Sequence, residues 1–158
     1  MITIGSHERQ RNAMTVDVED YFQVSAFEAH VDRNSWESTP LRVERNVENL
    51  LALFDEHDTK ATFFTLGWVA ERLPQMVRRI VDGGHEVASH GWEHARVTTQ
   101  TPEQFRQDVT RTRHLLEDLG GRRIIKKKNA SYSIGANNLW AQDVLADKGH
   151  AYSSSIVT

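Results

Sequence analysis

Short runs of β-branched and apolar residues alternate with stretches of helical periodicity along most of this chain. The strand-like runs cover residues 13–18, 60–65, 85–89, 123–125 and 151–156. The stretches between them place apolar side chains three and four residues apart, which is the spacing of an amphipathic helix. Strands that are joined by helices pair in parallel through right-handed crossovers. The sequence therefore predicts an α/β fold in which helices flank a parallel sheet.

The helices have recognisable boundaries. A helix that opens after residue 100 has the clearest start, because Thr101 can cap it, Pro102 suits its first turn and Gln104 completes a capping box. An earlier helix has its last part beginning near Pro74, and a later helix is expected over residues 137–148.

Polar clusters lie at the ends of two of the strand-like runs. Acidic residues lie at positions 17, 19 and 20, and a histidine pair lies at positions 90 and 94. Parallel strands bring such clusters to one edge, which is the catalytic rim of a β/α barrel. A closed barrel takes about 250 residues, whereas this chain has 158 and ends as the last run should turn into a loop. We therefore expect an incomplete (β/α) barrel at residues 13–158, truncated, after a polar lead-in at residues 1–12.

The histidine pair predicts a metal site. His90 and His94 are four residues apart, so both imidazoles can reach one ion. Two imidazoles and a carboxylate hold a divalent metal and leave a position open for water. Two alternatives are less specific: the histidines are surface groups, or the acidic cluster caps the following turn.

Composition narrows the partners and the location. The formal net charge is −3, which gives no reason to expect nucleic acid or an anionic membrane as a partner. No apolar stretch approaches the roughly 20 residues that span a bilayer, and the first residues lack the apolar core of a secretory signal. The absence of cysteine permits a reducing compartment. A cytoplasmic location is the expectation.

Five segments together resemble the polysaccharide deacetylase family, which carries the NodB homology domain. They are residues 15–22, 61–67, 84–94, 131–135 and 152–155. The resemblance extends over about residues 13–156 and is strongest to the branch associated with exopolysaccharide and exosortase loci. It identifies residues 13–158 as part of such a deacetylase domain.

The resemblance implies a reaction and roles for individual residues. Asp17 would be the general base, and His90 and His94 would be metal ligands. The third protein ligand would be an acid shortly after the base, either Glu19 or Asp20. The implied reaction is metal-dependent hydrolysis of an N-acetyl group on a glycan, with zinc as the first candidate metal.

The sequence departs from the family pattern in the segment that precedes Ser131. The family has an Arg-x-Pro segment there, whereas this chain has Lys128 and Ala130 at those two positions. Lysine lacks the planar fork with which arginine clamps a carboxylate. Lys128 and Tyr132 are expected at the substrate site. The basic run from Lys126 to Lys128, taken with Arg122 and Arg123, is expected to be a solvated loop rather than a nucleic-acid patch.

A second departure concerns the general acid. The family has a histidine for this role on a late strand, and no histidine follows His150 in this chain. We therefore expect impaired catalysis, with a non-catalytic remnant that binds metal or glycan as the alternative. A third interpretation is an amide or imide hydrolase of the same fold. Aromatic residues between positions 21 and 36 mildly favour a sugar, although packing explains them about as well.

Overall fold

The computed structural model describes residues 13–154, and its five strands form one parallel sheet in the order β1-β2-β3-β4-β5. The strands are β1 (Met14–Val18), β2 (Ala61–Thr65), β3 (Glu86–Ser89), β4 (Lys126–Lys127) and β5 (Tyr152–Ser153). This confirms the α/β prediction. Among the described strands β1 and β5 do not pair, so the sheet is not closed, as in an incomplete barrel. The predicted lead-in at residues 1–12 and the end of the predicted last strand lie outside the described residues.

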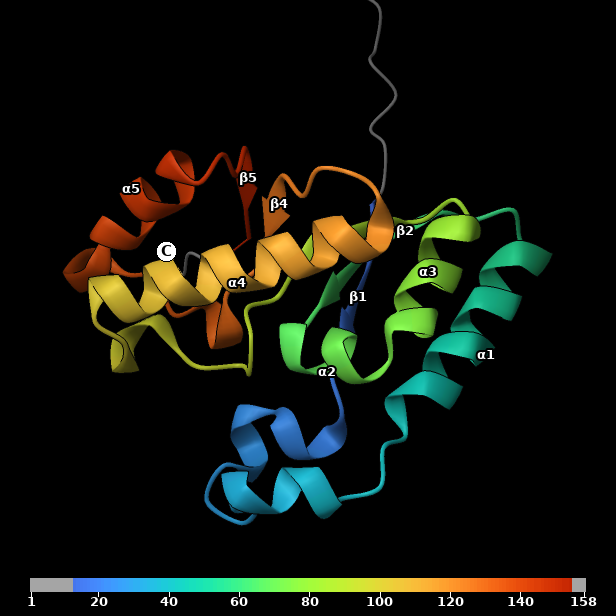
Figure 1. Ribbon diagram of the computed structural model, residues 1–158, viewed down its shortest axis with the longest axis horizontal. Helices are drawn as coiled ribbons and strands as arrows, with labels where there is room; N and C mark the ends of the chain where they lie inside the picture. Colours follow the sequence, from blue (N-terminus) through green and yellow to red (C-terminus); the bar gives the residue numbers. More distant parts are fainter. Residues whose placement is uncertain (1–12, 155–158) are drawn as a thin grey trace, which may run out of the picture.

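Five α-helices pack around this sheet (Figure 1). They are α1 (Val43–Glu56), α2 (Gly67–Arg72), α3 (Pro74–Asp82), α4 (Pro102–Gly120) and α5 (Trp140–Asp147). Helices α3 and α4 contact β3, while α1 packs on α3 and α5 packs on α4. Among the described residues, no helix is long and apolar enough to cross a membrane.

Short 3₁₀ helices fill several connections. They are η1 (Tyr21–Gln23), η2 (Ser25–Phe27), η3 (Arg33–Ser38), η4 (Val97–Thr99), η5 (Ala130–Tyr132) and η6 (Ala136–Asn138). In Figure 1, η1 to η3 form the blue and cyan segment beyond the carboxyl end of β1, before the chain enters α1. They therefore lie at the edge of the sheet that carries the polar clusters.

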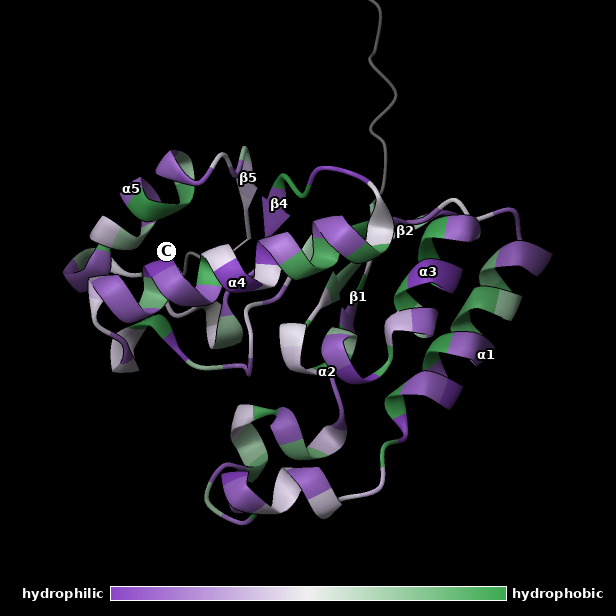
Figure 2. Cartoon of the chain, viewed as in Figure 1, coloured by the Kyte–Doolittle hydropathy of each residue, from purple (hydrophilic) through white to green (hydrophobic). Residues whose placement is uncertain are grey.

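The predicted helix signals are confirmed in α4. The hydroxyl of Thr101 accepts the Gln104 N–H, and the side-chain carbonyl of Gln104 accepts the Thr101 N–H. Gly121 ends the helix with φ of 63°, in the left-handed region that favours glycine. Figure 2 shows green apolar positions alternating with purple polar ones along α1, α3 and α4, as expected of helices that bury one face.

The core consists of two apolar clusters. The larger includes Phe63, Leu66 and Trp68 and lies under α1, α2 and α3. The smaller joins α4 to α5 through Phe105 and Leu145. Burial of such side chains contributes about 1.5–3 kcal/mol each, so these clusters hold the helices on the sheet.

The prediction of a strand over residues 123–125 is wrong. The ladder starts at Lys126, and Ile124 instead packs into the larger core cluster while its N–H donates to the Glu117 carboxylate. The helix expected from residue 137 likewise begins later, at Trp140, after the 3₁₀ turn η6. In both places the local pattern identified the apolar residues. Packing decided where the strand and the helix begin.

Candidate metal centre

The parallel register brings the two polar clusters to one edge. Val18 pairs with Thr65, and Thr65 pairs with Ser89. The strands β1 and β3 therefore end at the same level, on either side of β2. The N–H of His90 donates to the Thr65 carbonyl at 3.1 Å, which fixes the first residue after β3. Glu19, the first residue after β1, consequently faces the histidines.

Glu19, His90 and His94 form a group in which one ligand atom of each lies within 4.8 Å of the others. The Glu19 Oε2 atom is 3.2 Å from His94 Nε2 and 3.8 Å from His90 Nε2. The two imidazole centroids are 5.1 Å apart. Two histidine nitrogens and one carboxylate are a ligand set typical of zinc in hydrolases.

The tautomer of His90 follows from its second nitrogen. His90 Nδ1 lies 2.9 Å from the carbonyl oxygen of Lys128, and because a carbonyl only accepts, Nδ1 carries the proton. Nε2 then presents its lone pair toward Glu19. Orientation of a ligand imidazole by a backbone carbonyl is common in metal sites.

Two buried atoms of this group lack hydrogen-bond partners among the described residues. They are Glu19 Oε2 and His90 Nε2. A carboxylate oxygen and an imidazole lone pair that face each other repel, and leaving them unpaired costs about 1–3 kcal/mol each. A divalent cation would satisfy both atoms, so the residues present fit a metal ion.

Burial sets the protonation of the group. Burial, and then the neighbouring Asp17 charge, raises the pKa of Glu19 to about 7, while Lys128 opposes this shift. Burial lowers the pKa of His90 to about 4 and also lowers the pKa of His94. At neutral pH both imidazoles are therefore neutral, which is the form that binds metal.

Asp17 lies beside the group without belonging to it. Its Oδ2 atom is 4.0 Å from His90 Nε2 and 2.6 Å from the ammonium of Lys128. The side chain keeps 29% of its surface exposed, so a water molecule can reach the carboxylate. A carboxylate in this position can take a proton from water held next to it.

Asp20 has a different role from Glu19. Its Oδ1 atom accepts the Tyr21 N–H, and its Oδ2 atom accepts the N–H groups of Arg42 at 2.6 Å and Val43 at 3.0 Å. The carboxylate therefore caps η1 and the start of α1, and it is not in the metal-binding group. Of the two acids left open by the sequence, the geometry favours Glu19.

The prediction of a solvated basic loop is wrong for residues 126–128. Lys126 pairs with Glu86 at 2.6 Å, and Lys127 is buried on the opposite face of β4. The ammonium of Lys128 contacts the Asp17 carboxylate, and its predicted role in substrate binding stays a prediction. The side chain of Tyr132 lies outside the described part of the structure.

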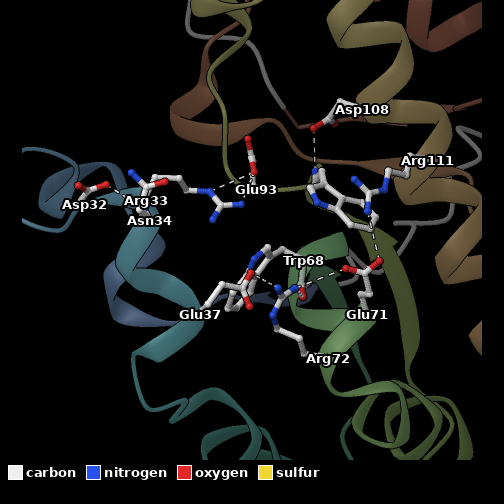
Figure 3. A network of polar contacts seen from close by, with 11 residues as sticks. Asp32, Arg33, Asn34, Glu37, Trp68, Glu71, Arg72, Glu93, Asp108 and Arg111 are labelled. Atoms are coloured by element: carbon white, nitrogen blue, oxygen red, sulfur yellow. Dashed lines mark hydrogen bonds and ion pairs between the residues drawn. The ribbon is translucent and has the colours of Figure 1, made fainter.

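Residues 90–94, here called the histidine loop, are held from several sides. The N–H groups of Gly67 and Trp68 donate to the carbonyls of Gly91 and Trp92 at 2.9 and 2.8 Å. In Figure 3, Glu93 also pairs with Arg33 of η3, which ties the loop to the segment after β1. Contacts from α2 and η3 thus fix the backbone between the two histidines.

Asp108 was not singled out by the sequence, yet it contacts this loop. Its Oδ2 atom accepts the Trp92 N–H at 2.9 Å, a bond drawn in Figure 3, and its Oδ1 atom is 3.7 Å from the Lys127 ammonium. The sequence carries one signal: Asp108 adjoins Val109 on the apolar side of α4, where a charge needs a partner.

A parallel α/β sheet with a two-histidine, one-carboxylate group at its carboxyl edge is the architecture of a barrel-type α/β hydrolytic enzyme. The family model for polysaccharide deacetylase matches residues 33–152. The chain belongs to the polysaccharide deacetylase family.

Similar sequences include known deacetylases. The chain is 33% identical over 72 residues to a peptidoglycan-N-acetylglucosamine deacetylase of Bacillus cereus, a match that covers 46% of this chain and 26% of that protein. It is 29% identical over 103 residues to a chitooligosaccharide deacetylase of a Bradyrhizobium species, covering 65% of this chain and 45% of the relative. The chain thus spans less than half the length of these relatives.

Solved structures share the fold. A crystal structure from Mycobacterium smegmatis, assigned as a polysaccharide deacetylase, superposes with a TM-score of 0.73 at 25% identity over 90% of this chain and 50% of that one. A CE4 family pseudoenzyme from Bacillus anthracis superposes with a TM-score of 0.68 at 18% identity, over 89% of this chain and 41% of that one. The second likeness shows the fold alone.

Proposed function

We propose that this chain is a metal-dependent deacetylase that removes N-acetyl groups from a carbohydrate. The observation that carries this proposal is the facing pair of buried, unpartnered ligand atoms, Glu19 Oε2 and His90 Nε2, with His94 beside them. The named activities of the relatives, on peptidoglycan and on chitooligosaccharide, support the substrate class. Zinc is the metal we propose, because neutral imidazoles with one carboxylate suit it.

In this proposal, metal binding and proton transfer are assigned to different residues. Glu19, His90 and His94 would hold the ion, which when bound supplies Lewis acidity toward a water molecule and the acetamide carbonyl. Asp17 takes the proton of the attacking water, since its carboxylate lies next to the ligand atoms and stays open to solvent. As the amide C–N bond breaks, the leaving amine takes up a proton, and the one that Asp17 has removed from water balances the reaction.

Lys128 orients the base in this proposal. Its ammonium contacts Asp17 Oδ2 at 2.6 Å, while its backbone carbonyl holds the proton on His90 Nδ1. One residue therefore positions both the base and a ligand. Because an ammonium is a point donor, it holds one carboxylate oxygen and leaves the other less constrained.

Acetate release tests the proposal directly. The zinc-loaded chain is incubated with N-acetylated chito-oligosaccharide, and free acetate is measured beside zinc content. We expect turnover by the unmodified chain and a loss of about 100-fold or more in Asp17→Asn, with the zinc content unchanged. Equal acetate release by Asp17→Asn and the unmodified chain would contradict the assignment of the base.

The alternative is a chain that binds metal or glycan without turnover. The ammonium of Lys128 favours this alternative, because it contacts the carboxylate oxygen that has to take up the proton. His90 and His94 both belong to the metal-binding group, so neither of these two is left to serve as the acid. Stoichiometric zinc without any acetate release would establish this alternative.

We also propose that the chain belongs to the branch associated with exopolysaccharide and exosortase loci, with an exopolysaccharide as the natural glycan. Motif likeness supports this proposal. A cytoplasmic location is proposed from composition. Comparing acetate release from peptidoglycan fragments, chito-oligosaccharides and partially acetylated exopolysaccharide would rank the substrates.

A further inference from the structure

An ion pair lies buried beneath the histidine loop. Lys127 of β4 has a side chain that is 1% exposed, and its ammonium lies 3.7 Å from Asp108 Oδ1 of α4. The ring of Phe105 lies on another side of the ammonium, 5.6 Å away. A lysine that turned toward solvent would avoid the cost of desolvation, so its burial here calls for a partner that holds it.

The second oxygen of Asp108 connects this pair to the histidine loop. Asp108 Oδ2 accepts the Trp92 N–H at 2.9 Å, midway between His90 and His94. One oxygen of Asp108 therefore faces the lysine ammonium, and the other oxygen accepts a hydrogen bond from the loop backbone. If Lys127 were absent, the carboxylate would lose the contact that orients it toward Trp92.

Gly91 shows how closely the loop rests on the pair. A Cβ atom at this position would lie 3.3 Å from Asp108 Oδ1 and 3.4 Å from Lys127 Nζ. Gly91 also has φ of 84°, which a side chain would oppose. The loop backbone at Gly91 thus passes close to both members of the pair.

We propose that the Lys127–Asp108 ion pair is a positioning element for the metal centre. The lysine holds the Asp108 carboxylate on the Trp92 N–H, and that bond fixes the path of the chain from His90 to His94. Neither residue touches the metal in this arrangement. The inference rests on the proposed metal site and assigns it a supporting pair.

Zinc affinity of the 158-residue chain tests this inference. The dissociation constant for Zn²⁺ is measured by competition with a chromophoric chelator, and thermal unfolding of the metal-free chain is recorded for each variant. We expect Lys127→Met and Asp108→Ala each to weaken zinc binding by about 10- to 100-fold, the usual effect of losing an outer partner of a ligand. The double variant Lys127→Met/Asp108→Asn leaves no unpaired buried charge and keeps an acceptor for Trp92, but Lys127 no longer holds that acceptor. It should therefore bind zinc more tightly than Lys127→Met and more weakly than the unmodified chain.

Lys126→Met is the matched control. It breaks the ion pair with Glu86 on the opposite face of the same strand, away from the histidine loop, and should leave the zinc dissociation constant unchanged. If Lys127→Met fails to fold, Asp108→Asn and Asp108→Ala are compared instead. The inference requires tighter binding by the asparagine variant, which keeps the acceptor.

The outcomes separate the two proposals. If the unmodified chain binds no zinc, the proposed metal site is wrong, and the inference is overturned with it. If the unmodified chain binds zinc and the Lys127 and Asp108 variants bind equally well, with only their melting temperatures lowered, the pair is merely structural. The metal site then stands and the positioning role is overturned.

Discussion

The ammonium of Lys128 lies 2.6 Å from the carboxylate of Asp17, although 111 positions separate the two residues in the chain. This contact joins the end of β1 to the segment after β4 at the rim of the sheet. Lys128, which stands where the family pattern has arginine, thus lies directly against the proposed base.

Lys128→Arg is expected to raise acetate release several-fold. A guanidinium can hold both oxygens of Asp17 in a bidentate pair, whereas the ammonium holds one. The measurement is kcat for a chito-oligosaccharide in the zinc-loaded chain. Lys126→Arg serves as the control, because Lys126 pairs with Glu86 rather than with Asp17. A fall in kcat on Lys128→Arg would contradict the orienting role.

Asp20→Ala is expected to destabilise the fold by about 2–4 kcal/mol. It removes the acceptor of three backbone N–H groups at the starts of η1 and α1. Chemical denaturation measures the loss of unfolding free energy.

Glu19→Gln is the converse variant: it should abolish tight zinc binding and leave metal-free stability nearly unchanged. Loss of zinc binding by a well-folded Asp20→Ala chain would return Asp20 to the ligand set.

Zinc binding is expected to weaken about tenfold per pH unit as the pH falls below about 7. The pKa of Glu19 is raised to about 7, so below that pH a proton must leave before the carboxylate can bind. The pKa of His90 is lowered to about 4, so that imidazole stays neutral well below pH 6. Calorimetry between pH 5.5 and 7.5, in buffers that differ in ionisation enthalpy, counts the released protons. A count near one is expected at the low end of this range, falling toward zero at the high end as Glu19 loses its proton. A count of two or more would show that the histidines also titrate.

Gly67→Ala is expected to destabilise the chain by about 1–3 kcal/mol and to weaken zinc binding. A Cβ atom at this position would lie 2.4 Å from the Trp92 ring, so the histidine loop would have to move. Gly135→Ala is the control, because a Cβ atom there meets nothing within 4 Å and its φ of −140° suits alanine. Unchanged zinc affinity in Gly67→Ala would show that the loop tolerates the shift.

Much of the fold follows from short-range pattern. The capping residues of α4 and the apolar periodicity of α1 predict those helices because their signals lie within a few residues of each other. The β4 strand escapes such reasoning. Its ladder covers only Lys126 and Lys127, two residues that have low strand propensity and pair only because β3 and β5 flank them.

The sequence by itself determined the α/β class, the strand-end position of Asp17, His90 and His94, and the family. These depend on residue type, spacing and order, which are local properties. Only the tertiary structure shows that Glu19 lies in the group with the two histidines, whereas Asp20 accepts backbone N–H groups at the start of α1. It also decided that Lys127 is buried with Asp108 rather than solvated. The sequence shows that Lys127 carries a charge. The partner that allows this charge to be buried, Asp108, comes from α4 and is brought to it only by the fold.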